Sequence, residues 1–228
     1  MQRMDKIYTT WPFYGYRKIT RELSKNGEVF NHKRILRLMQ IMGIQSLTPK
    51  VNLSKPNKDH LIFPYLLRNV SITKTNQVWS TDITYIPLYR GFAYLVAVMD
   101  WFSKYVLSWE ISNSLDVHFC LSALDKALRS GKPEIFNTDQ GSQFTSLNFV
   151  NKVLDNDVRL SMDSKGRALD NIFIERLWRS LKYEDIYLKE YRNYHELFVG
   201  LKNYFNFYNN KRTHQSLGYK TPAEIFFK

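Results

Sequence analysis

The stretch from residue 76 to residue 111 constrains the fold most, because its apolar pattern is that of β-strands joined by very short links. Side chains alternate around Asp82, with Thr81 and Ile83 pointing one way and Asp82 the other. Residues that favour strands fill 92–100 and again 104–111. Links this short join antiparallel neighbours, so we expect a meander of three strands.

Beyond that meander, helical patterns alternate with single strands. Apolar stripes predict helices over 115–129 and 146–154, and short apolar runs predict strands over 134–138 and 158–162. Right-handed crossovers place such helices over a sheet. The sequence therefore predicts an α/β fold with a five-stranded mixed sheet flanked by helices, in which the first and fourth strands can be neighbours.

The charge balance points to a polyanionic partner without requiring one. Lys and Arg number 33 against 21 Asp and Glu, a formal net charge of +12, which suits nucleic acid. A protein that is basic for other reasons fits equally well. Cys120 is the single cysteine, which excludes an internal disulfide or thiolate zinc cluster and agrees with a cytoplasmic location. Residues 1–11 lack a signal-peptide stretch and Asp100 interrupts the longest apolar run, so no membrane contact is expected.

Residues 16–44 have the pattern helix, turn, helix. Gly27 breaks the first helix, and Asn31 can cap the second, whose apolar side chains recur at helical spacing up to Gly43. Three basic residues remain for its outer face: Lys33, Arg34 and Arg37. This is either a small DNA-binding element or a helical hairpin with a solvated basic face. Residues 50–58 are polar and basic, the composition of a linker that could lie along phosphates.

A helix is expected from Asp170 or Asn171, either of which can cap it, to about residue 183. One face of this helix is apolar, and the opposite stripe carries Asn171, Glu175, Arg179 and Lys182. Lys182 lies roughly 10 Å along the axis from Glu175, so it could hold a DNA phosphate while Glu175 faces a metal. The alternative is a solvated face with an ion pair between Glu175 and Arg179.

Three acids are the candidate catalytic residues: Asp82, Asp139 and Glu175. Taken singly, each has a structural explanation, as a solvent-facing strand residue, a turn-former or a solvated helix residue. Taken together, they come from the first strand, the end of the fourth strand and the helix after the fifth, so all three can meet at one edge of the sheet. Oxygen ligands suit Mg²⁺, and three carboxylates can hold two ions for in-line displacement at phosphorus.

Several longer motifs surround these acids. They read PFYGYRKITREL and NHKRILRLMQIMGI near the start, NQVWSTDITYIP around Asp82, FNTDQGSQFTS around Asp139, LDNIFIERLWRSLKYE around Glu175, and FYNNKRTHQSLGYKTPAE in the tail. Thirty-five residues separate Asp139 from Glu175. With these motifs the chain resembles the catalytic subunit of bacterial insertion-sequence transposases, whose core is similar to retroviral integrase. The resemblance runs from about Pro12 to the tail.

The resemblance implies a ribonuclease-H-like core and dependence on Mg²⁺ or Mn²⁺. It implies nicking at transposon-end DNA and attack by the freed 3′-hydroxyl on target DNA, with Asp82, Asp139 and Glu175 as metal ligands. Lys182 matches the basic residue that the family places seven after its glutamate, and Asn171, one turn before Glu175, could orient the carboxylate or a DNA phosphate. The expected partners are further copies of the chain on DNA and a helix-turn-helix protein from an upstream reading frame of the element. The expected location is the bacterial nucleoid.

The resemblance and the patterns together predict a division of the chain. We expect a helical DNA-binding segment over 1–48, shortened relative to the family, a basic linker over 49–75, the catalytic core over 76–183 and a helical extension over 184–228. In that extension, a helix over 194–209 precedes a capping sequence at Thr221 to Glu224, and His214 is expected to have a structural role. Two other functions remain open, a nuclease of the same fold that only hydrolyses DNA and a DNA-binding regulator or relic without catalysis.

Overall fold

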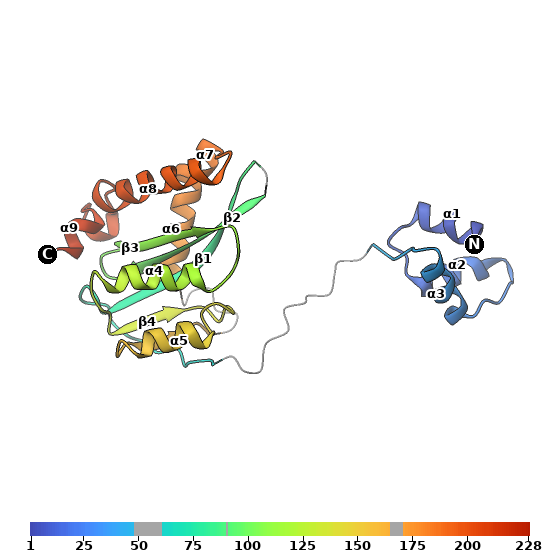
Figure 1. Ribbon diagram of the computed structural model, residues 1–228, viewed down its shortest axis with the longest axis horizontal. Helices are drawn as coiled ribbons and strands as arrows, with labels where there is room; N and C mark the ends of the chain where they lie inside the picture. Colours follow the sequence, from blue (N-terminus) through green and yellow to red (C-terminus); the bar gives the residue numbers. More distant parts are fainter. Residues whose placement is uncertain (48–60, 90, 165–170) are drawn as a thin grey trace. The chain divides into compact units, whose positions relative to one another are not determined.

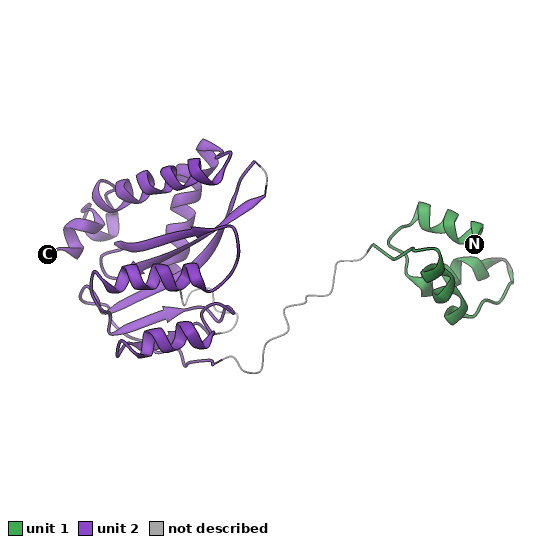
Figure 2. Ribbon diagram, in the orientation of Figure 1, with its two compact units in different colours: residues 1–56 green, residues 57–228 purple. Residues whose placement is uncertain are grey.

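A computed structural model of the chain describes residues 1–47, 61–89, 91–164 and 171–228. These residues belong to two compact units, Met1–Pro56 and Asn57–Lys228, drawn in green and purple in Figure 2. The basic stretch at residues 50–58 lies outside the described residues. Among residues 61–77, which have no regular structure, Leu67 is buried against Val78 of the core unit, so part of the predicted linker packs on that unit.

The N-terminal unit consists of short helices around its own small core. Helices α1 (Gln2–Thr10), α2 (Tyr16–Leu23) and α3 (His32–Ile41) supply the buried side chains. These are Met4, Ile19, Leu23, Ile35 and Met39. The predicted cap of α3 is formed, since the Asn31 side chain accepts a hydrogen bond of 2.8 Å from the Lys33 amide. The sequence pattern does not predict α1, because few apolar side chains mark its inner face and none of its side chains caps it.

The core unit is built on the five-stranded mixed sheet that the sequence predicts (Figure 1). Its strands are β1 (Val78–Pro87), β2 (Phe92–Asp100), β3 (Val106–Ser112), β4 (Ile135–Thr138) and β5 (Arg159–Met162). They lie in the order β3-β2-β1-β4-β5, with β1 to β3 antiparallel and β4 parallel to both β1 and β5. As expected, β1 and β4 are neighbours.

Helices cover both faces of the sheet. On one face lie α4 (His118–Leu128) and α5 (Leu147–Leu154), and on the other lie α6 (Ile172–Leu181) and α8 (Tyr194–Asn210). None of the helices in the described part of the chain combines the length and apolarity that a bilayer crossing requires.

Alternation along β1 decides which face each of its side chains meets. Trp79 packs with the α4 and α5 cluster, whereas Ile86 packs with the α6 and α8 cluster. Asp82 has the parity of Ile86, so its carboxylate lies on the α6 face. Strand alternation thus directs this acid toward the helix that carries Glu175.

The chain after α6 forms the helical extension. It consists of a π-helical turn (Lys182–Ile186), α7 (Tyr187–Lys189), α8, a 3₁₀ turn (Gln215–Leu217) and α9 (Pro222–Phe226). The capping box predicted at the start of α9 is present. The π-helical turn is not predicted, because the helix expected from the sequence ends at about residue 183, partway through that turn.

A hydrogen-bonded cluster ties the π-helical turn to the tail. The Arg212 guanidinium donates to the Glu184 carboxylate through Nε at 2.9 Å and Nη2 at 2.6 Å, and the Tyr204 hydroxyl donates to the same carboxylate at 3.1 Å. His214 lies within 3.2 Å of this guanidinium and edge-on to the Tyr208 ring. The end of the helix that carries Glu175 is therefore fixed by residues near the C-terminus.

Gly200 on α8 is a point of close approach to the preceding segment. A Cβ atom there would lie 1.9 Å from the Tyr191 hydroxyl oxygen, and that hydroxyl donates a hydrogen bond of 2.6 Å to buried Asp185. We expect Gly200→Ala to lower the free energy of unfolding by about 1–3 kcal/mol, the range of core overpacking. Urea denaturation measures this loss. Gly131→Ala is the control, since its Cβ would meet Asn76 at an ordinary 3.5 Å, and equal stability of the two variants would contradict the packing.

His214 should make stability depend on pH. Burial, followed by the Arg212 charge, lowers the pKa of His214 from 6.5 to about 4. The unfolded chain then binds a proton that the folded chain does not, so the His214 contribution is complete above about pH 6.5 and is lost as pH falls toward 4. We expect the stability difference between wild type and His214→Gln to shrink across this window. Denaturation curves at several pH values measure it, and a constant difference would contradict the assignment.

Candidate active site

Asp82 lies in the central strand β1, opposite Ala97 of β2 and beside β4. Its carboxylate is partly buried, and the Trp178 indole of α6 donates a hydrogen bond of 2.9 Å to its Oδ2. Burial raises the pKa of Asp82 to about 6, the indole hydrogen bond opposes the rise, and the charges of Asp139 and Glu175 add to it. The charges of the other two predicted acids, Asp139 and Glu175, therefore both affect ionisation of Asp82.

Asp139 is the first residue after β4. Strands β1 and β4 pair in parallel from Val78 with Ile135 to Ser80 with Asn137. The same offset, carried two residues further, sets Asp139 opposite Asp82. Neighbouring strands are roughly 4.8 Å apart, so the parallel register makes these two acids neighbours across the sheet.

The backbone holds the Asp139 carboxylate in place. Its Oδ1 accepts a hydrogen bond of 2.8 Å from the Gly141 amide, and a Cβ atom on Gly141 would lie 2.9 Å from that oxygen. Burial raises the pKa of Asp139 and the Gly141 hydrogen bond opposes the rise. The local turn expected for an isolated Asp is thus present, and it also presents the acid next to β1.

Glu175 is exposed in the first turn of α6. The structural alternative for this residue, an ion pair with Arg179, is not formed among the described residues. Asp82 and Asp139 have no ion-pair partner there either. The charges of Asp139 and Glu175 both oppose ionisation of Asp82, and a bound cation would offset this repulsion.

The donor set suits a hard divalent cation, although the acids are not gathered into one coordination shell. Carboxylate oxygens are the ligands that Mg²⁺ and Mn²⁺ prefer, and the mutual repulsion at Asp82 fits a positive ion. Among the described residues, no group of three or more acidic, histidine or cysteine side chains is arranged to hold a metal. The site thus matches such a cation in charge and ligand type.

Two side chains, from Asn171 at the N-cap of α6 and from Trp178 within α6, attach this helix to β1 beside Asp82. Asn171 is buried at the start of α6, where its Nδ2 donates to the Thr81 carbonyl at 3.4 Å. Its side chain makes no capping hydrogen bond, which corrects the capping role considered for it. Trp178 is absent from the sequence prediction because it counts among the apolar side chains of α6, although its seven-residue spacing from Asn171 places it at the border of the polar stripe. The signal that could have identified it is its indole N–H, a donor that buried tryptophan usually pairs.

The basic residues predicted to contact DNA lie at exposed or partly exposed positions. Arg179 is exposed one turn beyond Glu175, and Lys182 is partly exposed where the π-helical turn begins. In the N-terminal unit, the basic residues of α3 are exposed. These are Lys33, Arg34 and Arg37. Their contacts with DNA remain predictions.

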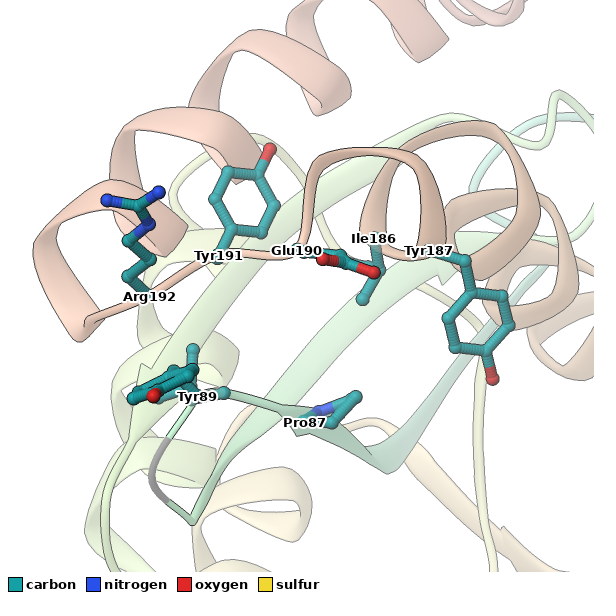
Figure 3. A pocket seen from close by; sticks show the side chains of 8 residues that line it. Pro87, Tyr89, Ile186, Tyr187, Glu190, Tyr191 and Arg192 are labelled. Carbon is teal, nitrogen blue, oxygen red and sulfur yellow. The ribbon is translucent and has the colours of Figure 1, made fainter.

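A separate cavity lies at the far end of β1. It has a volume of about 620 Å³ and is lined by Pro87 to Tyr89 on one side and by residues between Ile186 and Arg192 on the other. Figure 3 shows Tyr89 and Pro87 facing Tyr191 and Glu190 across it. None of the predicted site residues is among those that line it.

The chain matches models of known protein families over most of its length. Residues 72–168 match an integrase core domain, residues 156–222 match a second integrase core model, and residues 1–51 match an HTH-like domain. The integrase core match at residues 72–168 falls within the core unit, and the HTH-like match at residues 1–51 falls within the N-terminal unit.

Similar proteins include the transposase for insertion sequence element IS904 of Lactococcus lactis, which is 31% identical over 226 residues that cover 93% of this chain and 87% of that protein. The transposase for IS629 of Shigella sonnei is 29% identical over 92% of this chain and 73% of that protein. Among solved structures, the HTLV-2 integrase catalytic core in complex with magnesium has a TM-score of 0.54 at 22% identity, covering 67% of this chain and 97% of that one. The simian T-cell lymphotropic virus intasome has a TM-score of 0.60 at 16% identity, covering 99% and 74%.

Proposed function

The chain belongs to the insertion-sequence transposases with an integrase core domain, and we propose that it cuts DNA at the ends of its element and joins them to target DNA through Asp82, Asp139 and Glu175. One observation carries this assignment. The parallel pairing of β4 with β1 brings Asp139 next to the strand that carries Asp82, and the Trp178 hydrogen bond to Asp82 joins the helix that carries Glu175 to the same strand.

Asp82, Asp139 and Glu175 would hold the divalent cation, Mg²⁺ or Mn²⁺, and we propose two ions. When bound, such ions favour ionisation of an attacking hydroxyl and offset charge on the leaving oxygen of a phosphodiester. The residues prepare this site in different ways. Burial of Asp82 and Asp139 makes their negative charge costly without a cation, and Gly141 fixes one carboxylate at the sheet edge.

Basic residues would place the DNA on the acids. Arg179 and Lys182 follow Glu175 along the same helix, so phosphates beside the cut bond can lie over them while Glu175 faces the metal. In the N-terminal unit, the exposed basic face of α3 would contact a second stretch of DNA. This assigns positioning of the DNA to the lysines and arginines and chemistry to the acids.

We further propose that the chain works as an oligomer on DNA at the nucleoid, together with an upstream-frame helix-turn-helix protein.

Both steps of the proposed reaction use the same three acids. Water attacks first and frees a 3′-hydroxyl, and that hydroxyl then attacks a phosphorus of the target, with one phosphodiester bond broken and one formed. A nuclease of the same fold would stop after the first step.

The test uses the purified full chain with a labelled element-end duplex, supercoiled target DNA and Mg²⁺. We expect Asp82→Asn, Asp139→Asn and Glu175→Gln each to lower joined product more than about 100-fold, beyond the usual loss from removing a partner of a metal ligand. Gel analysis of nicked and joined DNA measures both steps. Asp155→Asn, at an exposed position on the core unit, is the control and should keep wild-type activity.

The outcomes separate the possible functions. Joined product that survives the three substitutions would show that the acids are not catalytic. Nicking without joining in the wild type would identify a hydrolytic nuclease. DNA binding with neither product would identify a regulator or relic.

A further inference from the structure

Two hydrogen bonds connect one edge of α6 to adjacent residues of β1. Asn171 donates to the Thr81 carbonyl and Trp178, seven residues later, donates to the Asp82 carboxylate. Residues seven apart lie nearly above one another on a helix, so both bonds arise from the same edge. Glu175 lies between them in the sequence. The helix that supplies one predicted metal ligand therefore also holds another.

The Trp178 bond acts on the carboxylate itself. At 2.9 Å the indole N–H engages Oδ2 of Asp82, and a hydrogen bond to a charged acceptor is stronger than one between neutral groups. This bond restricts rotation of the Asp82 side chain. Without it, the carboxylate could rotate and present either of its two equivalent oxygens to a cation.

Packing alone does not require this bond. Trp101 is as buried as Trp178, each with 6% of its surface exposed, and Trp101 packs on Phe173 of the same helix with a ring-centroid distance of 4.9 Å. The Trp101 indole nitrogen nevertheless has no hydrogen-bond partner among the described residues. Among the described residues, one buried indole thus lacks a partner, whereas the other donates to a predicted metal ligand.

We infer that Trp178 is a positioning residue, which holds Asp82 in the orientation that receives a divalent cation and keeps Glu175 in register with it. The inference rests on the proposed function, because it assumes that Asp82 binds the cation. Partners of metal ligands of this kind raise metal affinity about 10–100-fold. Trp178 itself need not touch the cation or DNA.

The experiment compares Mn²⁺ binding by the DNA-free full chain, followed by electron paramagnetic resonance of free Mn²⁺. We expect Trp178→Phe to weaken binding about 10-fold, whereas Trp101→Phe, which removes an unpaired indole N–H of equal burial, should bind like wild type. In strand-transfer assays, Trp178→Phe should need about 10-fold more Mg²⁺ for half-maximal rate, with much of the maximal rate restored at saturation. Thermal unfolding of both variants measures the packing loss they share.

Failure of the inference and failure of the proposed function differ in result. If Mn²⁺ binding depends on Asp82 but is equally strong in Trp178→Phe and Trp101→Phe, the positioning role is wrong and the proposed function stands. If wild type shows no Mn²⁺ binding that Asp82→Asn removes, both are wrong.

A measurement on the wild-type chain covers the case in which Trp178→Phe does not fold. The chain has five tryptophans, so the Trp178 indole N–H resonance can be assigned by elimination using Trp→Phe changes at the other four. It should shift on addition of Mg²⁺ more than the Trp101 resonance does. A Trp178 resonance that Mg²⁺ leaves unmoved would overturn the positioning role.

Discussion

The parallel pairing of β4 with β1 is the contact on which the site depends. It brings β4, which follows α4 in the chain, next to β1, the central strand of the sheet. The resulting register sets Asp139 opposite Asp82, although 56 residues separate them in the sequence. A shift of one residue would move one carboxylate to the other face of the sheet, where α4 and α5 pack.

The site also depends on α6 and on what holds its two ends. Near its start, Asn171 bonds to β1, and beyond its end Glu184 is bonded by Arg212 from the tail. Asn209 of α8 further joins the extension to the sheet, since its amide exchanges two hydrogen bonds of 2.9 Å with the backbone of Val106 on the edge strand β3. The C-terminal extension thus supports the helix that carries Glu175. The catalytic core and this extension therefore pack together through these hydrogen bonds.

Sequence patterns predicted several features that a local signal decides, although the cap considered at Asn171 is not formed. Strand alternation around Asp82, the Asn31 cap and the Thr221–Glu224 capping box each involve residues close together in the chain, and all are present. Features that depend on distant partners were not predictable in this way. Trp178 reads as an apolar residue until β1 lies beside it, and Glu184 of the π-helical turn is bonded by Tyr204 and Arg212, which lie far along the chain. The register between β1 and β4 likewise requires the assembled sheet, so the sequence indicated that the three acids can meet at one edge but not which residues of the two strands lie opposite each other.

The central claim is that Asp82, Asp139 and Glu175 form one cation site. The most direct test is an anomalous difference map from crystals of the full chain grown with Mn²⁺. We expect density between the carboxylates of Asp82 and Asp139, at about 2.0–2.6 Å from their oxygens, with Glu175 drawn toward it when two ions bind. Mn²⁺ density confined to other parts of the molecule, with these carboxylates left without it at saturating metal, would contradict the claim.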